Sequence, residues 1–333
     1  MKGIDLMINE EIIQVRNLKR TYQTTEGMFK RKRRTVEALQ GITFSVHEGE
    51  IIGLLGPNGA GKTTTIKILT TMLAPTSGEV RILGLDPVKD FKQLRPRINF
   101  ILGGERNLYW RLSAYDNLVY FADLYRVPRL VQKSRIPQLL ELVGLTEVAH
   151  RRVETFSKGM KQKLQIARGL INDPKILFLD EPTIGLDPVS ARQLRDILRG
   201  LKQQGTTILL TTHYMPEADE LCDRIAFINQ GLISILDTPE ELKKRIDQIS
   251  VIACSIPGLT EEEHGNIANH PAVLNLQAGE PDQLEHLRIQ TRTPQELVME
   301  LYSIAGAARM ANLSITTPTL EDVYIQMIGG EVS

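Results

Sequence analysis

The residues best suited to chemistry in this sequence lie in one glycine-rich segment, residues 56–63, which reads GPNGAGKT. This is the pattern G-x-x-x-x-G-K-[ST], whose glycines allow backbone N–H groups to turn inward around a phosphate. Lys62 would place a positive charge between the β- and γ-phosphates, and the Thr63 hydroxyl would bind Mg²⁺. The predicted contacts to a nucleoside triphosphate come from Asn58, Gly59, Ala60, Gly61, Lys62, Thr63 and Thr64.

The sequence around this segment agrees with such a site. The apolar run Ile51–Leu55 precedes it, and a helical pattern with Ile66, Leu69 and Leu73 on one face follows it. A bound phosphate would therefore meet the positive end of a helix dipole as well as the loop. A glycine-rich turn without a ligand is the alternative, and the full match to the pattern in this context argues against it.

A pair of acidic residues predicts the second half of the same site. Asp180 and Glu181 follow the apolar run Ile176–Leu179, at the strand edge where α/β proteins bind their ligands. Asp180 would associate with Mg²⁺, normally through water. Glu181 would polarise the attacking water as a general base. Together with the glycine-rich segment, the pair predicts nucleotide hydrolysis.

An α/β domain must position these residues. Apolar runs at 51–55, 176–179 and 207–210 predict buried parallel strands, separated by helical patterns. One helix would begin after Asp187 as N-cap, with Pro188 in its first position. The stretch Ile225–Leu236 predicts a hairpin that turns at residues 229–231.

A second unit is predicted from Thr238 onward. Residues 238–241, TPEE, form a capping box that opens a short helix. The order that follows is β-α-β-β-α-β, which is the ferredoxin-like arrangement, and a last helix starts at Thr319. The predicted elements are strand 249–256, helix 260–269, strand 272–277, strand 284–291, helix 294–307 and strand 312–316.

Composition narrows the class of protein. Lys plus Arg equals Asp plus Glu, 40 against 40, so overall charge does not support nucleic-acid binding. The two cysteines, Cys222 and Cys254, lack metal-type spacing and fit a reducing cytosol. No signal-peptide pattern is found at the N-terminus, and no apolar run approaches the length of ~20 residues that spans a bilayer. Work across a membrane would need another chain.

Several further motifs resemble those of ATP-binding cassette proteins, in the order and spacing of that family. Residues 156–162, FSKGMKQ, look like its signature motif, and Ser157 would cap the helix that follows while Gly159 allows close approach to a ligand. Tyr22 stands where the family has its adenine-stacking aromatic residue, Asp187 ends a segment similar to the D-loop, and His213 resembles the switch histidine that contacts the γ-phosphate.

The resemblance implies a complete mechanism. Each ATP would lie between the P-loop of one copy and the signature motif of a second copy, so the chain would work as a homodimer with ATP and Mg²⁺. The fold would be a P-loop ATPase domain, residues 9–237, with a RecA-like core and a helical subdomain. Residues 238–333 would form a small α+β domain. Transmembrane permease chains would be partners, which places the protein at the cytoplasmic side of the membrane, where it would power export of a substrate that the sequence does not identify.

This sequence departs from the family pattern in two places. In the first, Lys158-Gly159-Met160 replaces Gly-Gly-Gln in the signature. The segment PTLEDVY, residues 318–324, is a related feature near the C-terminal end. Both features resemble exporters of drugs and polysaccharides. In the second, the family has a glutamine after the strand that corresponds to Ile98–Leu102, but here the loop reads GGERNLYW. Either Gly104 or Glu105 takes that position, and Glu105 is a candidate Mg²⁺ ligand.

Helical patterns at 116–125 and 134–143 correspond to the subdomain that, in the family, receives a coupling helix of the permease. Tyr109, Trp110 and Tyr115 either line that groove or pack as core of the subdomain.

Three questions stay open. The basic block Lys30–Arg34 is a solvated hairpin tip, a contact for anionic lipid, or a nucleic-acid signal that nothing else in the chain supports. The unit from residue 238 is regulatory or dimer-stabilising, with cargo recognition as the alternative. A soluble ATPase of the same family that acts on DNA or ribosomes is the alternative function; it would carry long coiled coils or two P-loops, and neither is present.

Overall fold

We describe a computed structural model of the chain over residues 10–26, 32–102, 108–245, 250–278, 286–306, 309–316 and 318–329. The chain divides into two compact units, Met1–Thr238 and Pro239–Ser333. Within the described residues, no helix is both long enough and apolar enough to cross a membrane.

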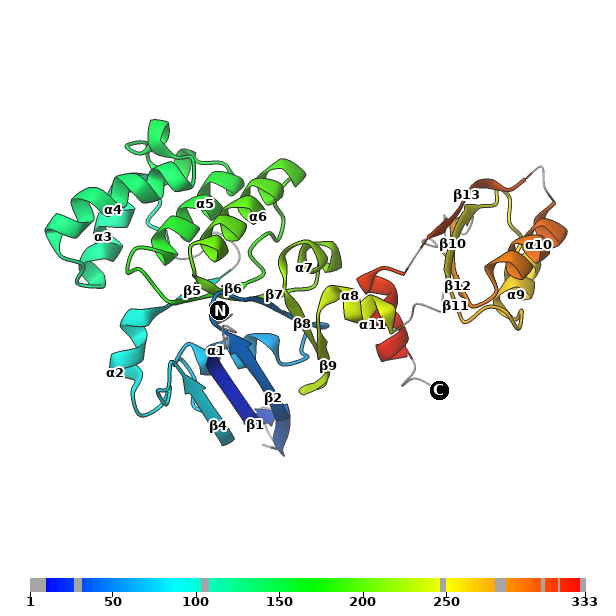
Figure 1. The fold of residues 1–333 in the computed structure, drawn as a ribbon, viewed down its shortest axis with the longest axis horizontal. Helices are drawn as coiled ribbons and strands as arrows, with labels where there is room; N and C mark the ends of the chain where they lie inside the picture. Colours follow the sequence, from blue (N-terminus) through cyan, green and yellow to red (C-terminus); the bar gives the residue numbers. More distant parts are fainter. Residues whose placement is uncertain are drawn as a thin grey trace, which may run out of the picture. The chain divides into compact units, whose positions relative to one another are not determined.

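A six-stranded sheet forms the centre of the first unit (Figure 1). Its order is β5 (Ile98–Leu102), β6 (Ile176–Asp180), β7 (Thr207–Thr212), β3 (Ile51–Leu55), β8 (Arg224–Asn229) and β9 (Leu232–Asp237). All neighbours pair in parallel except β8 and β9, which form the predicted hairpin. The apolar runs of β3, β6 and β7 are buried almost throughout, as strands covered on both faces must be.

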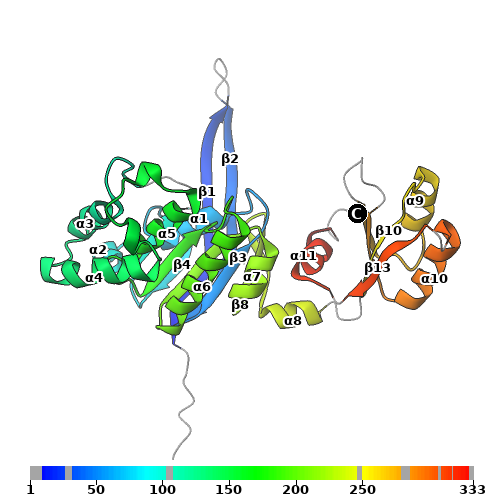
Figure 2. The ribbon, with the colours of Figure 1, turned by 90° about the horizontal axis from the view of Figure 1, so that it is seen from above.

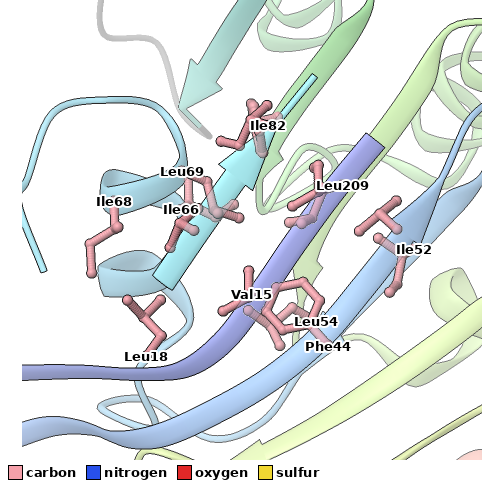
Figure 3. Packing of buried hydrophobic residues seen from close by; sticks show 14 of the residues in the cluster. Val15, Leu18, Phe44, Ile52, Leu54, Ile66, Ile68, Leu69, Ile82 and Leu209 are labelled. Carbon is pink, nitrogen blue, oxygen red and sulfur yellow. The ribbon is translucent and has the colours of Figure 1, made fainter. Parts of the chain in front are cut away.

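A three-stranded antiparallel sheet lies against this core, in the order β2 (Lys32–His47), β1 (Glu11–Glu26), β4 (Ser77–Ile82). One hydrophobic cluster joins it to the central sheet and to α1 (Lys62–Leu69). In Figure 3, side chains from α1 such as Ile66 and Leu69 lie near Val15 of β1 and Ile82 of β4. This packing fixes the helix that follows the glycine-rich segment.

The β1–β2 hairpin is longer than the sheet it belongs to. Strand β4 pairs with β1 only as far as Lys19, whereas β1 and β2 stay paired to Glu26 and Lys32. The remaining residues therefore form a two-stranded ribbon (Figure 2). Of the basic block, Lys30 and Arg31 lie outside the described residues, and the side chains of 32–34 are not described.

The other helices of the first unit follow α1 in chain order. A short α2 (Phe91–Leu94) and a 3₁₀ turn (Arg95–Arg97) lead into β5. Helices α3 (Ala114–Leu124) and α4 (Arg129–Leu142) pack together and against α5 (Lys158–Gly169), with 3₁₀ turns at Thr146–Val148 and Val153–Thr155. Helices α6 (Pro188–Gln203) and α7 (Met215–Leu221) complete the unit. Helix α4 begins five residues earlier than the sequence pattern predicts, immediately after Pro128.

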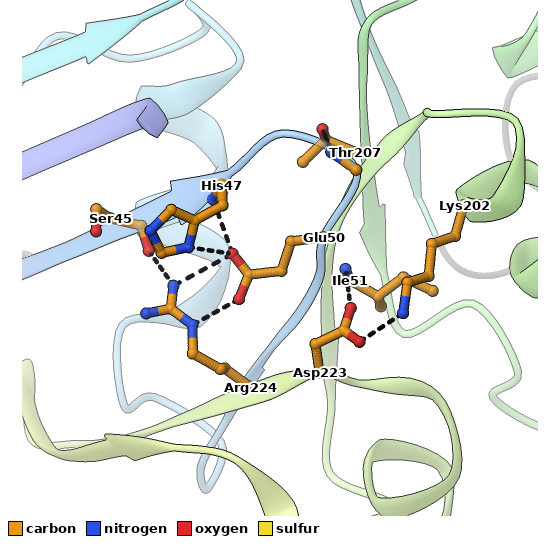
Figure 4. Close-up of polar contacts among 9 residues, drawn as sticks. Ser45, His47, Glu50, Ile51, Lys202, Thr207, Asp223 and Arg224 are labelled. Carbon is orange, nitrogen blue, oxygen red and sulfur yellow. Dashed lines mark hydrogen bonds and ion pairs between the residues drawn. The ribbon is translucent and has the colours of Figure 1, made fainter. Parts of the chain in front are cut away.

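An ion-pair network fixes the start of β3 and β8, at the opposite end of these strands from the glycine-rich segment (Figure 4). Glu50 is buried and accepts from the Arg224 guanidinium at 2.6 and 3.2 Å and from the His47 N–H at 2.8 Å. Arg224 also donates to the Ser45 carbonyl. Asp223 accepts from the Ile51 N–H and pairs with Lys202. Glu50 thus has partners despite its burial, and the partly exposed Asp223 is paired as well.

The second unit has the predicted β-α-β-β-α-β order. Its sheet runs β11 (Asn275–Ala278), β12 (His286–Thr291), β10 (Ser250–Ser255), β13 (Ala311–Thr316), which is the ferredoxin-like strand order. Helices α9 (Glu261–Ala268) and α10 (Pro294–Ala305) cover one face around Ile252 and Ile289. Helices α8 (Pro239–Lys244) and α11 (Leu320–Gly329) contact each other.

The PTLEDVY segment has a structural role in this second unit. Asp322 is buried and accepts hydrogen bonds from the Thr319 N–H, from Arg288 and from Gln290. These bonds cap α11 and attach its first turn to β12. They also lower the pKa of Asp322 against the opposing effect of burial.

Candidate active site

The glycine-rich segment leads directly into α1. Gly61 is the N-cap, with φ of 112°. A Cβ at this position would lie 2.7 Å from the Ala38 carbonyl oxygen of β2, so both the backbone angle and the close contact require glycine. The Lys62 ammonium donates to the carbonyl oxygens of Gly56 at 2.6 Å and Pro57 at 3.0 Å. The lysine side chain thus bonds to carbonyl groups of its own loop.

The electrostatics of Lys62 suit an anion-binding role. Burial lowers the pKa of its ammonium, and the nearby carboxylates of Glu181 and Asp180 partly offset that effect. The cation is therefore held where it is poorly hydrated. A phosphate that enters the loop replaces two neutral carbonyl partners with a charged one, which gives a stronger hydrogen bond.

Asp180 lies at the end of β6, close to the glycine-rich segment. Its Oδ2 is 3.4 Å from the Thr63 Oγ1, and its Oδ1 accepts from the Thr211 hydroxyl of β7. The carboxylate is thus oriented from two sides by parallel strands and by α1. These hard oxygen atoms fit Mg²⁺, which in phosphate sites takes one or two protein oxygens and completes its shell with phosphate and water. No larger cluster of His, Cys, Asp and Glu suited to a metal occurs within the described ranges.

Glu181 and His213 face each other across the ends of β6 and β7. Glu181 Oε1 lies 3.1 Å from His213 Nδ1. The backbone of Glu181 has a φ of 51°, a left-handed conformation that costs a non-glycine residue roughly 1–2 kcal/mol. Its N–H donates to the Thr211 carbonyl at 3.0 Å, which holds the turn. The strained turn aims the carboxylate toward the histidine rather than back along the strand.

A cavity of about 320 Å³ adjoins this pair. Glu181 and His213 line it together with Thr183, Gly185 and Arg195. It extends the site from the acidic pair toward the D-loop segment.

Glu217 is a buried carboxylate that motif analysis missed. It lies on α7, and neither of its oxygens has a hydrogen-bond partner of good geometry within the described part of the chain. Burial raises the pKa of its carboxyl group, and the hydroxyls of Thr212 and Thr183 and the charges of Arg195 and His213 only partly offset that rise.

The predicted signature residues form the start of α5. Ser157 is its N-cap and accepts from the Met160 N–H at 3.2 Å, as predicted. Gly159 packs so closely on α6 that a Cβ would lie 2.4 Å from the Ser190 Oγ. The Lys158 ammonium lies against Gly185. Within the described residues, no hydrogen bond joins 157–159 to the glycine-rich segment of the same chain.

Asp187 has a local structural role. Its carboxylate caps α6 by accepting from the Val189 and Ser190 N–H groups, at 3.0 and 2.9 Å, with Pro188 first in the helix as predicted. The hydrogen bonds from Ser190 are the main cause of its lowered pKa.

Tyr22 lies on the β1–β2 ribbon opposite Val36, two residues before the Ala38 carbonyl that contacts Gly61. The Arg20 guanidinium stacks 4.8 Å above its ring. The register of the β1–β2 pair therefore places Tyr22 near the glycine-rich segment. Gly104 and Glu105 lie outside the described residues.

The structure brings Lys62, Thr63, Asp180, Glu181 and His213 together at one edge of the central sheet. Ser157 and Gly159 instead lie at the start of α5, where Gly159 packs against α6. Thr211, which orients Asp180 and supports Glu181, was missed by sequence reasoning; its place at the end of an apolar strand beside the acidic pair was the available signal.

Comparisons with known proteins agree with this site. Residues 39–184 match the family model described as ABC transporter. A fluoroquinolones export ATP-binding protein of Mycobacterium tuberculosis is 45% identical over 71% of this chain and 74% of its own length. The linearmycin resistance ATP-binding protein LnrL of Bacillus subtilis is 32% identical over 96% of this chain and 98% of its own length.

A solved structure is similar as well. The dimeric structure of a post-hydrolysis state of the ATP-binding cassette MJ0796, bound to ADP and Pi, is 26% identical with a TM-score of 0.59. It covers 68% of this chain and 98% of the other.

The chain belongs to the ATP-binding cassette family of transporter ATP-binding proteins, and it is an ATP hydrolase of that type. The relatives described above are named for export and for antibiotic resistance, so they do not support the alternative of an ATPase that acts on DNA or ribosomes.

Proposed function

We propose that this chain hydrolyses MgATP as one half of a homodimer and powers export of a small antibiotic-like molecule through separate permease chains. The observation that carries the hydrolysis is the convergence of Lys62, Asp180, Glu181 and His213 at one edge of the sheet. The names of the relatives, fluoroquinolones export and linearmycin resistance, support the class of cargo.

The residues take distinct roles in this proposal. Lys62 leaves the Gly56 and Pro57 carbonyls and binds the β- and γ-phosphates. Thr63 and Asp180 would hold Mg²⁺, which would neutralise phosphate charge. Glu181 accepts the proton of the attacking water. His213 holds the Glu181 carboxylate in position and reaches the γ-phosphate. Tyr22 stacks on the adenine.

The dimer is proposed because the signature has no role in its own chain's phosphate site. Gly159 packs against α6 while Ser157 is exposed, and the first turn of α5 has N–H groups suited to an anion. The γ-phosphate bound by a second copy is that anion in our proposal. The dimeric cassette bound to ADP and Pi supports this arrangement.

Permease docking is proposed on the helical subdomain. Tyr109 and Trp110 are about half exposed, so their interpretation as core residues is wrong, while Tyr115 is half-buried against His150. Tyr109 stacks edge-on with Tyr120, and Trp110 covers the Lys161 ammonium at 4.7 Å. An exposed aromatic face of this kind is typical of a protein interface.

The proposal also covers the location of the ATPase domain, the role of the second unit and the basic block. The ATPase domain, residues 9–237, would lie peripherally on the cytoplasmic face of the membrane. Residues 238–333 would regulate or stabilise the dimer. Contact of Lys30–Arg34 with anionic lipid is the finer part of this proposal, and replacing the five residues with Ser should then weaken binding to anionic vesicles, most at low salt.

Mixing two inactive variants tests the shared site. Lys62→Ala removes the phosphate cation but leaves the signature intact. Ser157→Asp keeps an equally good N-cap but places a carboxylate beside the γ-phosphate of the partner. In a 1:1 mixture half of the dimers carry both variants, and each of these has one intact site of two. If the sites act independently, the mixture should regain about a quarter of wild-type activity.

The same experiment has a clear negative outcome. If Ser157 acts on ATP within its own chain, mixing restores nothing above the two variants alone. Full activity of either single variant would remove that residue from the mechanism.

A further inference from the structure

A second cavity lies between the ATPase core and the helical subdomain. It has a volume of about 380 Å³, and its lining residues come from β5, from the 3₁₀ turn before it, from α5, and from the segments that follow α1 and α3. Its lining residues are Thr70, Met72, Arg95, Ile98, Asn99, Phe100, Leu102, Tyr125 and Arg168. Two guanidinium groups thus line it, and no carboxylate is among the described lining residues.

Arg168 forms the inner wall. Its side chain is more than nine-tenths buried, and its Nε has no hydrogen-bond partner within the described ranges. One terminal nitrogen donates to the Phe100 carbonyl at 3.2 Å, and the guanidinium lies 5.0 Å from the Phe121 ring centroid. Burial lowers its pKa, which is the effect expected of a buried cation without a nearby anion.

Arg95 forms the outer wall and is exposed. It donates from Nε to the Thr71 hydroxyl at 2.9 Å and from one terminal nitrogen to the Thr71 carbonyl, and it stacks over Phe91 at 5.0 Å. These neutral contacts orient the guanidinium and leave its charge uncompensated. No ion pair of Arg95 or Arg168 is found in the described residues.

The other polar groups of the cavity are already paired with one another. Tyr125 donates its hydroxyl to Asn99 Oδ1 at 3.1 Å, and the Asn99 amide donates to Asn172 at 2.7 Å. A ligand that enters would therefore be bound mainly through the two guanidiniums. Such forks match a carboxylate in shape and charge, and the hydrogen bonds are charge-assisted.

We propose that this cavity receives an aspartate or glutamate side chain of the permease, placed between Arg95 and Arg168. The inference rests on the proposed function, because the permease is the partner assigned there to the same subdomain. Charge complementarity selects a carboxylate, and the apolar lining from Met72, Phe100 and Leu102 accommodates the backbone and neighbouring side chains of the entering segment.

Zero-length carbodiimide cross-linking provides the test, because it joins an amine only to a carboxylate in direct contact. The Arg95→Lys variant keeps the charge and adds an amine at the cavity mouth. The full-length variant is purified from detergent-solubilised membranes of the cells that naturally make it, treated with carbodiimide, and analysed by peptide mass spectrometry.

Arg97→Lys is the matched control. Arg97 is two residues away and lines a different cavity that contains Glu10, Glu11 and Asp173 of this chain. Its lysine variant should cross-link within the chain, which confirms that the chemistry works at this edge of the protein.

Coupling of the residue at 95 to an Asp or Glu of a co-purifying membrane chain supports the proposal. Coupling to Glu105 of this chain, to a second copy, or to nothing overturns it. If no membrane chain co-purifies with the wild-type protein, the permease part of the proposed function fails too. If a membrane chain co-purifies but does not cross-link to residue 95, only the proposed carboxylate contact is overturned.

Charge reversal gives an independent readout. Arg95→Glu should weaken recovery of the membrane chain by at least about tenfold, since an interfacial charge pair is replaced by repulsion. Reversing the cross-linked carboxylate to Lys should restore it. ATP hydrolysis by the isolated Arg95→Glu chain should stay at the wild-type rate. Unchanged recovery of the membrane chain would contradict the proposal.

Discussion

Replacement of Glu181 by Gln separates catalysis from structure more sharply than any other change in the site. The glutamine keeps the length and shape of the side chain, and it inherits the same backbone φ of 51°, so strain is unchanged. Its amide oxygen still reaches His213 Nδ1 at 3.1 Å, and the N–H bond to the Thr211 carbonyl is unaffected. The protein should therefore fold normally and bind ATP normally.

The loss in rate follows from the missing base. An amide does not take a proton from water at neutral pH, and positioned general bases contribute about 10²–10⁴-fold to rate. This corresponds to roughly 3–5 kcal/mol in the activation barrier, at about 1.4 kcal/mol for each factor of ten. We expect the hydrolysis step to slow by at least about 10²-fold while the affinity for ATP stays within the range of the wild type.

Single-turnover hydrolysis at saturating MgATP measures this step directly, and equilibrium nucleotide binding provides the control. The slow variant should also accumulate as an ATP-dependent dimer in gel filtration. A single-turnover rate within threefold of wild type would show that Glu181 is not the base. Slow hydrolysis with only monomer at saturating MgATP would leave the base in place but remove the main support for the shared site.

Three further predictions concern other carboxylates. Glu50→Ala should lower the free energy of unfolding by about 3–5 kcal/mol in urea titration, because Arg224 loses its buried partner; an unchanged midpoint would contradict this. Glu105→Ala should raise the Mg²⁺ concentration for half-maximal activity if Glu105 ligates the metal, and leave it unchanged if Gly104 holds that position. Burial raises the pKa of the Glu217 carboxyl group, so the free energy of unfolding falls as pH rises through that pKa and the buried group becomes charged. Glu217→Gln should make the free energy of unfolding less dependent on pH and should increase it at pH values above that pKa. Equal pH profiles of unfolding for the variant and the wild type would contradict this. The titratable and charged groups that influence Glu217 are Arg195, His213 and Cys222.

Much of the fold and the centre of the site could be predicted because their causes are local. A buried parallel strand is a short apolar run, and a helix start is a cap residue followed by proline or an amphipathic pattern. Asp187 and Ser157 cap the helices for which they were assigned. The strand order of the second unit also agrees with the β-α-β-β-α-β prediction.

What could not be predicted depends on residues far apart in the chain. Strand β4 joins the antiparallel sheet through β1, which ends more than 50 residues earlier, and its own alternation is short. Thr211 reaches Asp180 across neighbouring strands, and Arg168 is recognisable as an unpaired cation only when its surroundings are known. Such contacts carry no local pattern, because a threonine or arginine has many roles in an apolar strand or helix.

The state of the site in a single chain agrees with the proposed role of a second copy. Lys62 is bonded to its own loop, Asp180 to Thr211, and Glu181 to His213, so each catalytic group has an internal partner. MgATP would compete for these partners, but the signature lies at the start of α5 and, within the described residues, makes no hydrogen bond to the glycine-rich segment of the same chain. A single chain therefore supplies the cation and the base and lacks the second set of donors for the γ-phosphate. In the proposed mechanism, charge on that phosphate stays exposed until another copy covers it, which would link nucleotide binding to dimer formation.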